Sequence, residues 1–131
     1  MRLALLVIVA ALVAGCGEDD EPPAAAPAGG LAELTVEVDP DGPDPRRPRT
    51  ATVRCDSAED SELCRAVDAL DAKVFAPTPG NVACTEQYGG PQTAKVTGTL
   101  RGERVDARFA RRNGCEIARW EDAAPLLEAA T

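Results

Sequence analysis

Hydrophobic and polar residues alternate strictly in the segment LTVEV, at residues 34–38. A period of two is typical of a strand with one buried face, and Asp39–Pro40 ends this one. The apolar positions that would face the core are Leu34, Val36 and Val38. After a loop rich in proline, the segment TATVRC at residues 50–55 predicts a second strand.

The hydrophobic period changes in residues 56–75. Apolar residues recur there every three or four positions, which is the spacing of one helix face; they are Leu63, Val67 and Leu70. Asp60 or Ser61 has the side chain needed to cap the N-terminus of such a helix. The sequence therefore predicts one main helix after the second strand.

Residues 93–110 predict a β-hairpin with a turn at Arg101–Gly102. Alternating apolar positions lie on both sides of this turn; they are Ala94, Val96 and Leu100, then Val105, Ala107 and Phe109. A second turn at Asn113–Gly114 precedes an apolar stretch that ends at Trp120, from which we expect a short last strand. The succession predicts an α+β fold with an antiparallel sheet of about five strands and one main helix.

Residues 1–15 predict an export leader. A single arginine precedes an apolar run that is too short to span a membrane comfortably. The run ends in LVAGC, which resembles the lipobox of bacterial lipoproteins and implies cleavage before Cys16 and attachment of lipid to its sulfur. That interpretation places the mature chain on the outer face of the cytoplasmic membrane, held there by its lipid. The other interpretation is an ordinary cleavable signal followed by a chance cysteine.

Residues 16–30 predict a tether between the lipid and a folded domain. Behind Cys16, the segment GEDDEPPAAAPAGG is acidic and rich in proline and alanine, and it has no residues with which to build a core. Fully extended, it would reach at most about 45–50 Å. Residues 31–131 then predict one small domain, whose core must come from aliphatic residues because the chain has only two phenylalanines, one tyrosine and one tryptophan.

The chain has five cysteines. If Cys16 carries lipid, an even number remains, namely Cys55, Cys64, Cys84 and Cys115, and disulfides persist outside the cytoplasm. Four cysteines allow three connectivities, among which the sequence does not choose. A zinc site is disfavoured because the chain has no Cys-x-x-Cys pair and no histidine. We therefore expect disulfides, with no metal and no cofactor.

Composition argues against several classes of function. Without histidine, the chain cannot assemble a Ser-His-Asp or Cys-His catalytic set, and it has no phosphate-binding glycine motif. Acidic pairs such as Glu59–Asp60 and Glu121–Asp122 lie in hydrophilic runs that are typical of solvated faces. The formal net charge of −8 argues against a nucleic-acid partner. We therefore expect a protein that is not an enzyme.

The segment from Val82 to Cys115 resembles the reactive-site half of the Streptomyces subtilisin inhibitor family. It has the same succession of a cysteine (Cys84), a short segment, a tyrosine (Tyr88), a turn with proline, and a hairpin with an x-G-x-R-V turn. With the earlier strands and helix, the resemblance covers residues 34–118. The chain departs from the family in its short acidic CDSAEDSELC segment, in YGGP where the family has Tyr-Asp-Pro, and in its tail EDAAPLLEAAT.

The resemblance implies a protease-binding loop and two disulfides, Cys55–Cys64 and Cys84–Cys115. The loop residues would be Cys84, Thr85, Glu86, Gln87 and Tyr88, with Glu86–Gln87 as the bond offered to the protease. Cys84 would hold one side of the loop, and Tyr88 and Pro91 would brace the other.

The implied function is a lipid-anchored inhibitor of a secreted or cell-surface serine protease, either glutamate-preferring or subtilisin-like. The alternative is a cell-surface lipoprotein that keeps the inhibitor fold as a non-inhibitory binding or structural module. The family often forms dimers through its sheet, which leaves a homodimer open.

Overall fold

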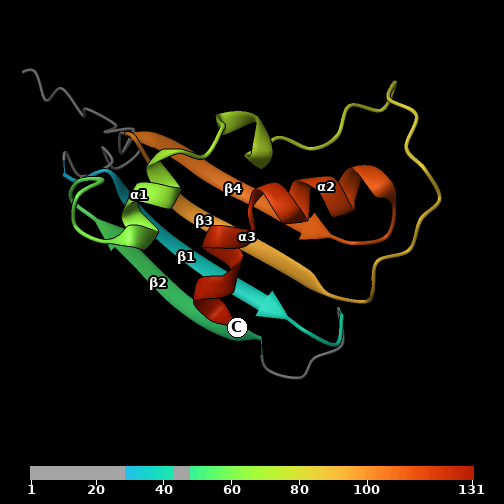
Figure 1. Ribbon diagram of the computed structural model, residues 1–131, viewed down its shortest axis with the longest axis horizontal. Coiled ribbons are helices and arrows are strands. Elements are labelled where there is room, and N and C mark those ends of the chain that lie inside the picture. Colours follow the sequence, from blue (N-terminus) through green and yellow to red (C-terminus); the bar gives the residue numbers. More distant parts are fainter. Residues whose placement is uncertain (1–28, 43–47) are drawn as a thin grey trace, which may run out of the picture.

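The computed structural model describes residues 29–42 and 48–131, so the expected leader, Cys16 and the tether up to residue 28 lie outside the described residues. The described chain has an α+β fold built on a four-stranded antiparallel sheet with the strand order β2-β1-β3-β4 (Figure 1). The strands are β1 (Ala32–Asp39), β2 (Arg49–Cys55), β3 (Thr93–Leu100) and β4 (Glu103–Ala110).

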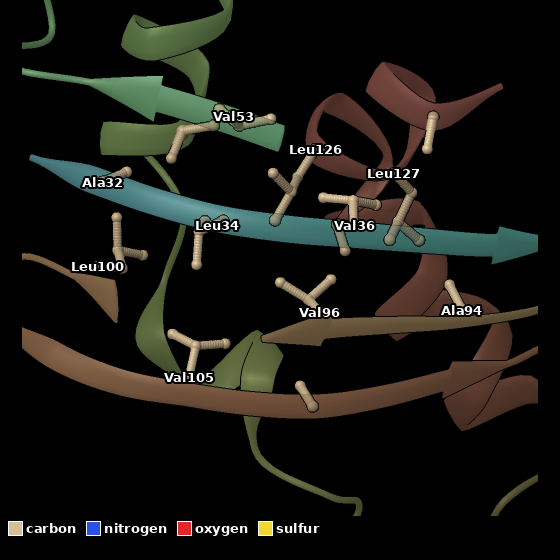
Figure 2. Packing of buried hydrophobic residues seen from close by; sticks show 14 of the residues in the cluster. Ala32, Leu34, Val36, Val53, Ala94, Val96, Leu100, Val105, Leu126 and Leu127 are labelled. Atoms are coloured by element: carbon tan, nitrogen blue, oxygen red, sulfur yellow. The ribbon is translucent and has the colours of Figure 1, made fainter. Parts of the chain in front are cut away.

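One face of the sheet is buried, as the alternating pattern predicts. The side chains of β1 alternate between buried and solvent-facing positions along its whole length, and Leu34 and Val36 are fully buried. The buried residues of the other strands lie on the same face; they are Val53, Cys55, Ala94, Val96, Leu100, Val105, Ala107 and Phe109. Figure 2 shows this aliphatic layer together with Leu126 and Leu127, which come from the end of the chain.

Helices cover the buried face of the sheet (Figure 1). They are α1 (Glu62–Asp68), the 3₁₀ helix η1 (Ala72–Phe75), α2 (Gly114–Asp122), α3 (Ala124–Leu127) and the 3₁₀ helix η2 (Glu128–Ala130). Cys64, Val67 and Val74 of the first two helices, and Leu126, Leu127 and Ala130 of the last two, close the core from above. None of the helices in the described ranges has the length and apolar character needed to cross a bilayer.

The turn at Arg101–Gly102 joins β3 to β4, so the predicted hairpin is confirmed. Both residues have a positive φ, 50° and 77°, as a two-residue turn matching the strand twist requires. A non-glycine residue adopts this conformation at a cost. The guanidinium of Arg101 offsets that cost by donating hydrogen bonds to the backbone oxygens of Asp68, at 2.8 Å, and Leu70, at 3.1 Å. The hairpin tip is thereby attached to the end of α1.

Of the two predicted capping residues, Ser61 caps the start of α1, whereas Asp60 holds the turn before it. Ser61 is the N-cap, and its hydroxyl oxygen accepts a hydrogen bond from the Cys64 N–H at 3.0 Å. The Asp60 carboxylate accepts hydrogen bonds from the N–H and hydroxyl of Ser57 and from the Asp56 N–H. Because these bonds favour the charged form, with the Ser57 N–H as the largest cause, the pKa of Asp60 is lowered.

The expected fifth strand is wrong, because the residues before Trp120 belong to helix α2. Asn113 does not turn the chain into a strand but caps the helix, since its side-chain oxygen accepts a hydrogen bond from the Glu116 N–H at 2.9 Å. Glu116 lies in the first turn of the helix, where the negative charge of its side chain interacts favourably with the helix dipole. A local capping interaction therefore decides the structure here, and the described sheet has four strands rather than about five.

Candidate functional site

Residues 76–92 form the long connection between η1 and β3, drawn in yellow at one end of the molecule in Figure 1. Within it, residues 83–90 form no helix, strand, turn or bend. We call residues 86–88, which are all exposed, the presented segment. We call residues 111–115, which lead from β4 into α2, the supporting segment.

Three links hold the presented segment against the supporting segment. The first is the disulfide Cys84–Cys115, which is one of the two pairings that the resemblance implies. The second is a hydrogen bond from the Gly114 N–H to the backbone oxygen of Thr85, at 3.0 Å. The third is a hydrogen bond from the Gly89 N–H to the Arg111 oxygen, at 2.7 Å. The links therefore lie on both sides of the presented segment.

Two glycines allow this close approach. A Cβ added to Gly89 would lie 2.8 Å from Cγ1 of Ile117 and 3.1 Å from the Arg111 oxygen. A Cβ added to Gly114 would collide with the hydroxyl oxygen of Thr85. The lack of a side chain at Gly89 therefore lets the backbone lie directly on α2.

The helix that supports the loop is itself anchored through Arg119. Its guanidinium pairs with the Glu116 carboxylate at 3.2 Å, and both side chains are only 13% exposed. The same guanidinium donates hydrogen bonds to the backbone oxygens of Val74 and Arg108, which ties α2 to η1 and β4. The Thr78 hydroxyl donates to Oε1 of Glu116 at 3.3 Å, so the beginning of the loop joins the same network.

The loop also carries the exposed hydrophobic side chains of the molecule. Among the described residues, the large hydrophobic side chains that stand out into solvent are Val82, at 48% exposure, and Tyr88, at 68%. Glu86 is exposed between them, and no described residue forms an ion pair with it. An exposed apolar side chain therefore lies on each side of Glu86 in the sequence of the loop, where a partner that covers the loop would contact it.

The expectation that Tyr88 braces the loop is wrong, because its side chain points into solvent. The link on that side comes instead from the Gly89 N–H, with Pro91 lying against the buried Gly42. Backbone groups of Arg111 and Gly114, and the side chains of Thr78, Glu116 and Arg119, were not anticipated as parts of the site. The sequence gives no signal for a backbone acceptor such as the Arg111 oxygen, whereas Asn113-x-x-Glu116 does have the spacing of a helix cap.

The rest of the described surface offers less chemistry. A hollow of about 420 Å³ at the loop-side end of the sheet combines the cations Lys95, Arg108 and Arg112 with the carboxylates Glu37, Asp39 and Glu116. Its charges of opposite sign do not select one kind of ligand. Within residues 29–42 and 48–131, no group of three or more histidine, cysteine or acidic side chains is placed to hold a metal ion.

The chain matches no protein-family model, no curated protein and no solved structure. The function must therefore be argued from the loop itself.

Proposed function

We propose that this protein inhibits serine endopeptidases by presenting the residues around Glu86–Gln87 as a substrate-like strand. The observation that carries the proposal is the exposed segment 86–88, which is held on both sides by the Cys84–Cys115 disulfide and by the backbone hydrogen bonds of Thr85 and Gly89. The resemblance to the subtilisin inhibitor family, whose features follow in the same order along residues 34–118, supports the same conclusion and supplies Glu86–Gln87 as the bond.

The physical reason is that an ordered loop loses little entropy when it binds. Fixing the backbone of one residue costs about 1–2 kcal/mol, so fixing three residues costs about 3–6 kcal/mol. At about 1.4 kcal/mol for each tenfold change, prior ordering of the presented segment is worth roughly a hundredfold to ten-thousandfold in affinity. After cleavage, the same supports hold the two new chain ends close together, which favours re-formation of the bond over release.

The proposed setting is the outer side of the cytoplasmic membrane, with a lipid anchor at Cys16. The two disulfides fit an oxidising compartment. The partner is then a secreted or cell-surface serine protease.

A second candidate function uses the same loop. Exposed tyrosine is enriched in protein interfaces of every kind, so the exposure of Tyr88 also favours a non-inhibitory binding module on the cell surface. In that case the loop would bind a partner without entering a protease cleft.

The proposal is tested by titrating the full mature chain against four serine proteases. Three of them cleave after acidic, basic or aromatic residues, and the fourth has a broad specificity. The expected result is stoichiometric inhibition of at least one, with slow cleavage confined to Glu86–Gln87. Rapid complete cleavage in the loop, or no inhibition of any protease, overturns the inhibitor proposal and leaves the binding module.

A further inference from the structure

The loop of residues 76–92 has almost no charged side chains, although the chain as a whole has many. Charged residues make up 27% of the sequence, yet Glu86 is the only one among the seventeen residues 76–92. Depletion of charge is what distinguishes the core of a protein interface from the rest of a surface. A single carboxylate retained at the middle of such a surface therefore needs an explanation.

Nothing in the described part of the chain neutralises this carboxylate. Glu86 is exposed, forms no ion pair, and lies one residue beyond the point where the Thr85 oxygen is held by the Gly114 N–H. A partner that covers the presented segment must therefore remove water from Glu86 and supply its new hydrogen bonds. Burying a charge without a partner costs several kcal/mol, so an apolar pocket would be a poor host and an acidic pocket a worse one.

From this geometry we infer that the target is an endopeptidase that prefers acidic residues, with a pocket for Glu86 lined by a cation or by converging hydroxyl and N–H donors. The inference rests on the proposed inhibitory function and specifies its partner. Basic and hydroxyl groups are the donors that hold a carboxylate most strongly.

The apolar neighbours of Glu86 refine the description of the partner. Tyr88 follows two residues later and Val82 precedes by four, and both side chains are exposed. In an extended chain, two residues span about 7 Å, so an apolar surface should lie about that far from the carboxylate pocket. The partner surface thus combines one charged pocket with apolar contacts on both sides.

The inference is tested with four full-length proteins: the wild type, Glu86→Gln, Glu86→Leu and Glu86→Lys. Each is titrated against a glutamate-specific, a chymotrypsin-like, a trypsin-like and a subtilisin-like serine protease. Glu103→Gln is the matched control, because Glu103 is exposed at the hairpin tip and loses the same charge.

The wild type should inhibit the glutamate-specific protease most strongly, and Glu86→Gln should weaken that inhibition about 30-fold or more. Glu86→Leu and Glu86→Lys should move inhibition toward the chymotrypsin-like and trypsin-like proteases, while Glu103→Gln should behave as the wild type. Inhibition of another protease that no Glu86 substitution changes would overturn the proposed carboxylate-binding pocket but leave the inhibitor. A panel in which neither the wild type nor any variant inhibits would remove the proposed function itself.

Discussion

The Cys84–Cys115 disulfide should stabilise the fold and order the loop, whereas Cys55–Cys64 should only stabilise the fold. In the loop-closure estimate, a bridge spanning 31 residues contributes about 3.7 kcal/mol and one spanning 9 residues about 2.6 kcal/mol. Cys55 and Cys64 are buried, so replacing them by alanine also leaves unfilled space that costs about 1 kcal/mol. Removing either bridge should therefore lower the free energy of unfolding by a similar amount, about 3.5 kcal/mol.

The two double-alanine variants then serve as controls for each other. Unfolding in guanidinium chloride can be followed by the fluorescence of Trp120, the only tryptophan in the chain, which lies in α2. Loop order is followed separately, by hydrogen exchange at the N–H groups of Gly89 and Gly114, which bond to the backbone oxygens of Arg111 and Thr85. Inhibition constants for any inhibited protease provide the third measurement.

We expect both variants to lose similar stability, but only the variant without Cys84–Cys115 to lose protection at Gly89 and Gly114. Freeing one residue beside the bridge costs about 1–2 kcal/mol on binding, so inhibition by that variant should weaken about tenfold. If both N–H groups keep their protection without the bridge, the hydrogen bonds alone order the loop and the reasoning is refuted. Equal loss of inhibition in both variants would instead trace the effect to global stability.

Three further results are expected. Cys16→Ser should release the protein from the membrane fraction or block its processing, and unchanged attachment in cell fractionation would contradict lipidation. Gly89→Ala should lower the free energy of unfolding by about 1–3 kcal/mol, because the new Cβ meets Ile117. Gly80→Ala, in the same loop with nothing within 4 Å, should be close to neutral in the same denaturation assay. Asp60→Asn should be less stable than the wild type at pH 7, and this difference should vanish as the pH falls below 3.8 and through the lowered pKa of Asp60, because the wild type gains its stabilisation only when that carboxylate is ionised.

Most of the sheet could be predicted because its buried face repeats a two-residue period. The segment around Leu34 alternates without exception, and the hairpin around Arg101–Gly102 combines alternation with a turn residue that tolerates positive φ. Ser61 gave the start of α1 for a local reason, since a cap depends only on the next three residues. These features are encoded within short stretches of chain.

The structure of residues 113–131 was harder to predict. The patterns that determine it are either ambiguous or depend on contacts with residues distant in sequence. Asn113–Gly114 suits a hairpin turn and a helix start equally well. What distinguishes the two is the hydrogen bond from the Glu116 N–H to the Asn113 side chain, which caps a helix. The tail EDAAPLLEAAT departs from the family's pattern, and the sequence does not predict that it contributes to the core. Leu126 and Leu127 are in fact fully or almost fully buried over the sheet.

The supports of the loop could be predicted only in part. A pairing of Cys84 with Cys115 followed from the resemblance, since cysteine spacing alone left three connectivities open. The hydrogen bond from the Gly89 N–H joins a loop residue to the Arg111 oxygen, and no side-chain pattern encodes a contact between two backbone groups that lie so far apart in sequence.

The chain enters the domain at one end of the sheet, and the presented segment lies at the other. The entry is fixed by hydrogen bonds of Leu31, whose N–H donates to the Asp56 oxygen and whose oxygen accepts from the Arg101 N–H. The loop joins β3 at Thr93, which pairs with the last residue of β1, so the eight residues of β1, about 26 Å of strand, separate the two ends (Figure 1). If Cys16 carries the lipid, the tether would join the domain at the end of the sheet opposite the loop. A soluble protease would then reach the loop from the side of the domain opposite the tether.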